Sequence, residues 1–270
     1  MIIADFHTHS SNSGDCDIPM SVQIEAAINK GISHLCITEH MDYDFPETPD
    51  ENISFVLDTD AYYKEFISNK EKYADKINLY FGVELGLQPH LANMHKDYIS
   101  KYDFDFIIGS SHVCDGYDVY YPDFYKNKDE KACYMRYFES ELENINAFND
   151  FDVYGHLDYV VRYGPTKDAN YQFNDYKDIL DEILKKLISS GKGIEINTGG
   201  LKKGMKETNP SLDILKRYKE LGGEIITVGS DAHFAENIAY GFDRAKGVLE
   251  KAGFTRYAVF KDRKPEFINL

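Results

Sequence analysis

The sequence predicts one α/β domain over residues 1–270, built from consecutive βα units around a mostly parallel sheet. Three observations predict this fold class. The chain has 270 residues, which is long for an ordinary domain but normal for a single α/β barrel. Apolar residues make up 43% of the chain, enough for a large core. Short apolar runs alternate with longer segments of helical periodicity about seven times.

The expected strands are short runs of apolar, β-branched or aromatic residues. They cover 2–6, 33–38, 77–85, 104–111, 151–157, 193–197 and 224–230. Segments with helical periodicity fall between and after them, at 20–30, 60–76, 130–149, 175–190, 210–221 and 235–252. Gly31 is a suitable C-terminal cap for the first helix. Pro210 and Gly222 bracket the fifth helix, with proline at its start and glycine at its end.

Two long polar segments, 41–60 and 113–130, directly follow strands and are rich in turn-forming residues. Loops of this length inside a compact domain are usually functional. The chain has no linker-like composition, internal repeat or low-complexity tract. We therefore expect a single domain with two functional loops.

Charge and cysteine content exclude several classes of protein. With 30 basic and 46 acidic side chains, the formal charge is −16, which argues against binding to nucleic acid or to anionic membranes. The sequence has no apolar run long enough to span a membrane and no signal-peptide pattern, so we expect a cytoplasmic location. Its four cysteines are irregularly spaced, which argues against a disulfide framework or a thiolate zinc site.

Metal-binding side chains are concentrated where the predicted strands end. His7 and His9 alternate on the first strand, so both point to the same side. In a barrel of βα units the carboxyl ends of all strands open onto one face, which gathers residues that are distant in sequence. The residues expected to meet there are His7, His9, Asp15, His40, Glu84, His112, His156, Asp231 and His233.

This donor set contains imidazole and carboxylate but no thiolate. It suits divalent zinc, manganese, iron or cobalt and disfavours copper(I) and iron–sulfur clusters. Nine ligands are too many for one ion, so we expect two or three, with zinc, manganese or iron as the cofactor. Such ions lower the pKa of bound water from 15.7 to about 7 and so supply hydroxide at neutral pH.

Six short motifs carry a family resemblance. They are "DFHTHS", "ITEH", "GVELG", "GSSH", "GHLD" and "GSDAH", and they span residues 5–233. With these motifs the chain resembles the PHP (polymerase and histidinol phosphatase) family, in particular its histidinol-phosphatase branch. The resemblance implies a distorted (β/α)7 TIM-like barrel with a trinuclear metal site at the carboxyl ends of its strands.

The resemblance also implies how the ligands divide among three ions. One ion is expected on His7, His9, Glu84 and Asp231, a second on the bridging Glu84 with His112 and His156, and a third on Asp15, His40 and His233. Many family members have histidine where this chain has Asp15. Asp17 is an alternative to that ligand.

The implied activity is that of a metal-dependent phosphomonoesterase. The expected reaction is attack of metal-activated hydroxide on L-histidinol phosphate, a small-molecule ester of histidine biosynthesis, to release L-histidinol and phosphate. One alternative keeps the chemistry but changes the substrate to a nucleotide, a sugar phosphate or a protein phosphotyrosine. The other is a non-catalytic module that binds metal and phosphate.

Four further residues are candidates for contacts with the substrate. Arg162 is placed to grip phosphate bidentately, with a surface ion pair as the alternative. Lys202, or its neighbour Lys203, is the second phosphate-binding candidate. Asp42 is either the acid that protonates the leaving group or a carboxylate that orients a histidine. Tyr117 either covers the substrate or packs within its own loop.

The remaining polar residues near these motifs are given structural roles. Asp5 and Asp158 are expected to support the ligands rather than to bind metal. His34 is expected to be structural, and we expect His90 and His95 on the surface.

Overall fold

A computed structural model describes residues 1–47 and 53–270. Within them, seven parallel strands form the central sheet, in the order β1-β2-β3-β4-β7-β8-β9. The strands are β1 (Ala4–Asp5), β2 (His34–Met41), β3 (Asn78–Gly86), β4 (Phe106–Ser110), β7 (Val153–Tyr154), β8 (Gly193–Asn197) and β9 (Ile226–Gly229). Each lies at one of the seven positions predicted from the sequence.

The first and last strands meet and nearly close the sheet into a barrel. The amide of Phe6 donates to the carbonyl of Val228 at 2.9 Å, and the amide of His9 donates to that of Ala232 at 3.0 Å. The Gln23 side chain reinforces this junction by donating to the carbonyls of both His9 and Ala232. The predicted distorted (β/α)7 barrel is therefore confirmed.

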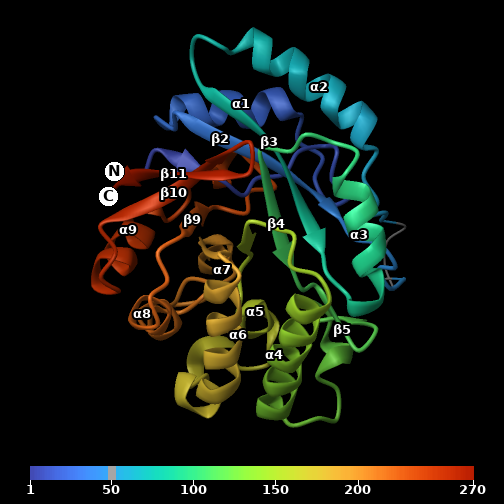
Figure 1. Cartoon of the computed structure of the whole chain (residues 1–270), viewed down its shortest axis with the longest axis vertical. Coiled ribbons are helices and arrows are strands. Elements are labelled where there is room, and N and C mark those ends of the chain that lie inside the picture. The colour runs from blue at the N-terminus through green and yellow to red at the C-terminus, as the bar shows by residue number, and fades with distance from the viewer. Residues whose placement is uncertain (48–52) are drawn as a thin grey trace.

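Helices surround the strands as an outer layer (Figure 1). They are α1 (Met20–Asn29), α2 (Thr59–Lys72), α3 (Ala92–Ile99), α4 (Glu130–Ala147), α6 (Lys177–Ser189), α8 (Leu212–Glu220) and α9 (Phe242–Lys251). Two short helices, α5 (Tyr159–Tyr163) and α7 (Gly199–Lys202), instead follow the carboxyl ends of β7 and β8. Side chains cap the two longest, since Asp58 accepts from the Ala61 amide and Asp129 from the Ala132 amide. Helices α3, α5 and α7 were not predicted, because segments of eight residues or fewer hold too little of the helical period.

A hairpin that we did not predict, β10 (Arg256–Lys261) with β11 (Lys264–Asn269), closes the opposite end of the barrel. It contacts residues just before the strands: Arg263 donates to Asp152 at 2.6 Å, and the Tyr257 hydroxyl accepts from the Ile3 amide at 3.0 Å. The ring of Phe260 packs 5.0 Å from that of Phe106. The strands therefore present only their carboxyl ends for a functional site.

The described parts of both predicted loops contribute residues to that open end. Residues 113–130 contain a short antiparallel pair, β5 (Val113–Cys114) and β6 (Tyr117–Asp118). Residues 48–52 of the loop predicted over 41–60 lie outside the described residues. Of the helices that the structure describes, none is long and apolar enough to cross a membrane.

Three histidines lie away from the strand ends. His34 bonds the Tyr80 hydroxyl at 2.8 Å, and the ring of His90 is 57% exposed beside Asp44. The expectation that His95 lies on the surface is wrong, because this residue is fully buried near Phe148. It belongs to α3, and because that helix was not predicted, its buried face could not be assigned.

Candidate metal centre

Glu84 stands at the centre of the residues gathered at the carboxyl end of the barrel. Its Oε2 lies 3.0 Å from His7 Nε2 and 3.1 Å from His40 Nδ1. Its Oε1 lies 2.9 Å from His156 Nε2 and 3.2 Å from His112 Nε2. The two oxygens of one carboxylate thus face different sets of imidazoles, which is the geometry that a carboxylate bridging two ions requires.

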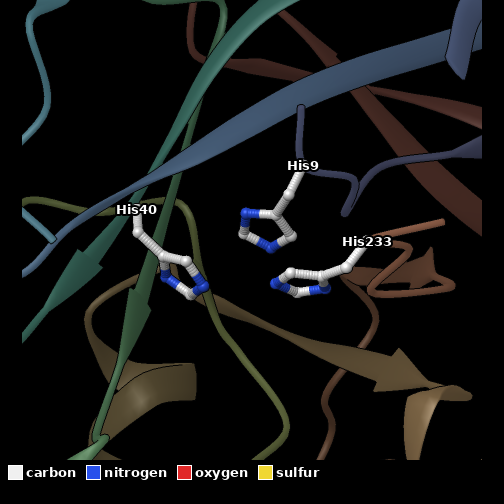
Figure 2. Close-up of side chains that lie close together, drawn as sticks. All are labelled: His9, His40 and His233. Atoms are coloured by element: carbon white, nitrogen blue, oxygen red, sulfur yellow. The ribbon is translucent and has the colours of Figure 1, made fainter. Parts of the chain in front are cut away.

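The remaining expected ligands complete the cluster on one side. His9, His40 and His233 point their rings toward one another (Figure 2). The Oδ2 of Asp15 lies 3.0 Å from His233 Nε2 and 3.7 Å from His40 Nε2. Asp231 Oδ1 lies 3.5 Å from His9 Nε2. All nine residues expected from the sequence therefore lie together, and their division among ions remains a prediction.

Two of these residues have strained backbones. His156 has a φ of 21° and Asp231 a φ of 55°, in the region that side chains other than glycine rarely adopt. Such conformations cost of order 1–3 kcal/mol each and are concentrated at functional sites. The strain turns both side chains from the strand ends toward the cluster.

Carboxylates on the outer side hold the histidine rings in place. His7 Nδ1 donates to Glu195 at 2.7 Å, and His112 Nδ1 donates to Asp42 at 2.6 Å. His9 Nδ1 lies 3.2 Å from the Ser13 hydroxyl, which itself donates to Glu39 at 2.5 Å. Because a proton on Nδ1 leaves the lone pair of Nε2 available to bind metal, these contacts aim Nε2 of each ring into the cluster.

Glu195 was missed in the sequence analysis. Besides His7, it accepts from the amide of His156 at 2.9 Å, so one carboxylate fixes two expected ligands. Gly229 leaves room for it, because a methyl group there would overlap both Glu195 and His7. The available signal was an acidic residue inside the apolar run "GIEIN", since a buried carboxylate needs partners.

Glu195→Gln is expected to weaken zinc binding about 10–100-fold, because the amide no longer holds the His7 ring by a charged acceptor. A competition titration against a chromophoric chelator measures this affinity. The matched control is Glu220→Gln, whose side chain is 64% exposed on α8 and should leave zinc affinity unchanged. Equal zinc affinity in Glu195→Gln and the unaltered protein would contradict the assigned role.

Buried nitrogens without partners fit a bound cation. Burial, together with repulsion from His40 and His233, lowers the pKa of His9 to about 3. Its ring is therefore neutral, the form in which imidazole binds metal. Within the described part of the chain, Nε2 of His9 and Nε2 of His233 are buried and make no hydrogen bond of normal geometry, although Asp15 Oδ2 lies 3.0 Å from His233 Nε2. A divalent ion bound between the two imidazoles and the Asp15 carboxylate would satisfy all three groups.

Arg162 is buried beside the cluster and is held on three sides. Its guanidinium donates to Asp231 at 2.8 Å, Asn197 at 2.9 Å and Asn209 at 3.1 Å. Asn209 in turn donates to Asp158 at 2.6 Å. These bonds use three of the five N–H groups of the guanidinium. Arg162 thus positions Asp231 and retains donors for a ligand above the cluster.

A cavity of about 330 Å³ opens directly over the cluster. Its described lining includes expected ligands together with Asp42, Arg162, Lys202 and Lys203. Lys202 also contacts Asn237 and lies 4.9 Å from the Tyr240 ring centroid. Both predicted phosphate-binding lysines therefore reach the cavity.

Of the residues predicted to contact the substrate, Tyr117 alone lies outside this lining. Its side chain is on the other face of β6, where the amine of Lys128 lies 5.0 Å from the ring centroid. Of its two suggested roles, packing within the loop matches this position. The neighbouring Asp118, Tyr120 and Tyr121 line the cavity instead.

A parallel barrel with histidines and carboxylates clustered at the carboxyl ends of its strands defines a metal-dependent barrel protein of the hydrolase type. The model of one family, the PHP domain, matches residues 5–199. The chain belongs to this PHP family, as the motifs led us to expect.

Curated relatives match nearly the whole chain. A histidinol-phosphatase from Lactococcus lactis is 33% identical over 261 residues, covering 96% of this chain and 95% of the relative. A probable histidinol-phosphatase from Clostridium acetobutylicum is 35% identical over 250 residues, covering 92% and 93%. The similarity therefore extends well beyond the metal-binding motifs.

Solved structures agree with the fold. The Lactococcus lactis histidinol phosphate phosphatase, in complex with zinc, L-histidinol and phosphate, superposes with a TM-score of 0.89 at 32% identity, covering 97% of this chain and 98% of that one. A putative histidinol phosphatase from Listeria monocytogenes has a TM-score of 0.78 at 19% identity, covering 89% of this chain and 99% of that one, which supports the fold alone.

Proposed function

We propose that this chain is a metal-dependent phosphomonoesterase that hydrolyses L-histidinol phosphate to L-histidinol and phosphate. The observation that carries the proposal is a cavity whose lining combines six of the nine clustered residues with the cationic side chains Arg162, Lys202 and Lys203. A related protein, 32% identical in sequence, holds zinc, L-histidinol and phosphate in its solved structure. This reaction would belong to histidine biosynthesis, with a cytoplasmic location as the expectation.

The chain's own residues divide the work. The nine clustered side chains would hold two or three divalent ions, with zinc favoured by the relative's structure and manganese or iron as alternatives. Such ions would lower the pKa of a bound water molecule and would stabilise negative charge on the phosphoryl oxygens. Arg162 and Lys202 would draw the phosphate to the cluster and neutralise its remaining charge, because both line the cavity.

Asp42 has two suggested roles, and its contacts favour the orienting one. Its Oδ1 accepts from His112 Nδ1 at 2.6 Å, and its Oδ2 lies 3.6 Å from His40 Nδ1. Although burial favours the neutral form, His112 and His40 hold the pKa of Asp42 below its ordinary value. A carboxyl group so disposed keeps its negative charge and positions the His112 ring, rather than delivering a proton.

The test is kcat/KM for phosphate release from L-histidinol phosphate, AMP, a sugar phosphate and a phosphotyrosine peptide, with zinc-loaded and with chelated protein. We expect a preference for L-histidinol phosphate of 100-fold or more, about 2.7 kcal/mol, and loss of activity on chelation. Uniformly slow rates would retain the metal chemistry but reject the substrate. Absence of turnover by the zinc-loaded protein would favour a binding module.

A further inference from the structure

One carboxylate in the cavity stands apart from the metal cluster. Asp15, Asp42 and Asp231 each lie within ion-pair distance of clustered histidines. Asp118 lines the same cavity, and its Oδ1 accepts from the Tyr120 amide at 2.8 Å. Among the described residues, no lysine, arginine or histidine forms an ion pair with Asp118. Because a partly buried carboxylate without a cationic partner is costly, a positively charged group on a ligand would stabilise it.

The backbone fixes Asp118 close to the floor of the cavity. Val113, the residue after His112, pairs with Asp118 across the β5–β6 hairpin. The amide of Val119 also donates to the carbonyl of His112 at 3.2 Å. The hairpin therefore holds the backbone of Asp118 next to that of His112, an expected metal ligand. Burial raises the pKa of Asp118 to about 6, so the group is ionised at neutral pH.

Aromatic rings continue from the cluster up the same part of the cavity wall. Tyr159 lies 4.6 Å from the His156 ring, Tyr163 lies 5.0 Å from Tyr159, and Tyr120 lies 4.8 Å from Tyr163, measured between centroids. All three tyrosines line the cavity. The planes of these rings are tilted or perpendicular to one another. Tyrosine rings offer flat faces for an unsaturated ring and attract cations.

We propose that Asp118 and these tyrosines form the subsite for the leaving alcohol, with Asp118 as the counter-ion of an ammonium group close to the ester oxygen. The inference rests on the proposed function and deepens it. It defines the preferred substrates as phosphate monoesters of amino alcohols that carry an unsaturated ring, and it separates their recognition from binding of phosphate itself. The tyrosines pack against the unsaturated ring of the alcohol, while Asp118 forms an ion pair with its ammonium group.

The test compares Asp118→Asn with the unaltered protein on two esters, L-histidinol phosphate and its analogue without the amine, 3-(imidazol-4-yl)propyl phosphate. Asp118→Asn removes a charge-assisted hydrogen bond that only L-histidinol phosphate can make. Its kcat/KM for this ester should therefore fall about 10–100-fold, whereas kcat/KM for the analogue should change less than about threefold. Inhibition by L-histidinol should weaken in parallel, while inhibition by inorganic phosphate stays constant. Asp123→Asn is the matched control, since that side chain is 60% exposed in the same loop.

Thermal unfolding and zinc content confirm that each variant is folded and loaded. Equal losses on both esters would mean that Asp118 only supports the hairpin, and would overturn the inference. Retention by Asp118→Asn of a strong preference for L-histidinol phosphate over its analogue would overturn it too. If the unaltered protein shows no preference for L-histidinol phosphate over p-nitrophenyl phosphate, the proposed function fails first, and the inference fails with it.

Discussion

Glu84→Gln is expected to lower kcat/KM for L-histidinol phosphate by about 10³-fold or more, equivalent to roughly 4 kcal/mol of transition-state stabilisation. The substitution keeps the size of the side chain but removes the charge that faces His7 and His40 through one oxygen and His112 and His156 through the other. A neutral amide bridges two cations poorly, so zinc content should fall together with activity. Steady-state kinetics and elemental analysis of the purified variant measure both.

Glu139→Gln provides the control for this prediction, since its side chain is 51% exposed on α4 and remote from the cluster. It should retain both zinc and activity. Normal zinc content with normal turnover in Glu84→Gln would show that the carboxylate is dispensable and would remove the central bridging ligand from the proposal.

The ligands were predictable because two simple regularities coincide. Alternation on the first strand puts His7 and His9 on one side, and βα topology brings the ends of distant strands to one face. Neither regularity depends on the exact strand boundaries. The side chains of residues as far apart as Asp15 and His233 could therefore be brought together from the sequence alone, and the structure places them 3.0 Å apart.

The positions of the residues that were missed are set by features that hydrophobic periodicity does not predict. Tyr117 was selected and its neighbour Asp118 was not, although adjacent residues of a strand point to opposite sides. The choice between them is set by the pairing of Val113 with Asp118 in a hairpin only two residues long on each side. Glu195 lies within its strand rather than after it, so a search of the strand ends passed over it.

The buried position of Arg162 explains why sequence reasoning left its role open. Among so many acidic residues, an arginine is easily assigned to a surface ion pair, yet Arg162 is only 3% exposed. Its guanidinium is held in the interior by the side-chain oxygens of Asn209 and Asn197, which are distant from Arg162 in the sequence. Such a network exists only in the folded structure and leaves no periodic signal.

Arg162→Met is expected to lower the free energy of unfolding of the metal-free protein by about 3–5 kcal/mol, the usual cost of removing one partner from a buried ion pair. The substitution leaves the carboxylate of Asp231, which is 10% exposed, without its guanidinium. It also leaves the side-chain oxygen of Asn209 without its donor, whereas that of Asn197 keeps the Gly199 amide. Urea denaturation in the presence of a chelator measures this change.

The comparison with Arg136→Met shows how much of the loss in unfolding free energy comes from burial of the ion pair rather than from removal of the charge. Arg136 makes short ion pairs with Asp115 and Glu143, but its side chain is 34% exposed. Because exposed pairs contribute about 0–1 kcal/mol, this variant should lose at most that much. If both variants lose the same stability, the buried network around Arg162 contributes no more than a surface pair. Arg162 would then be retained for its remaining donors, and the effect of Arg162→Met would appear in KM for the phosphate ester rather than in unfolding.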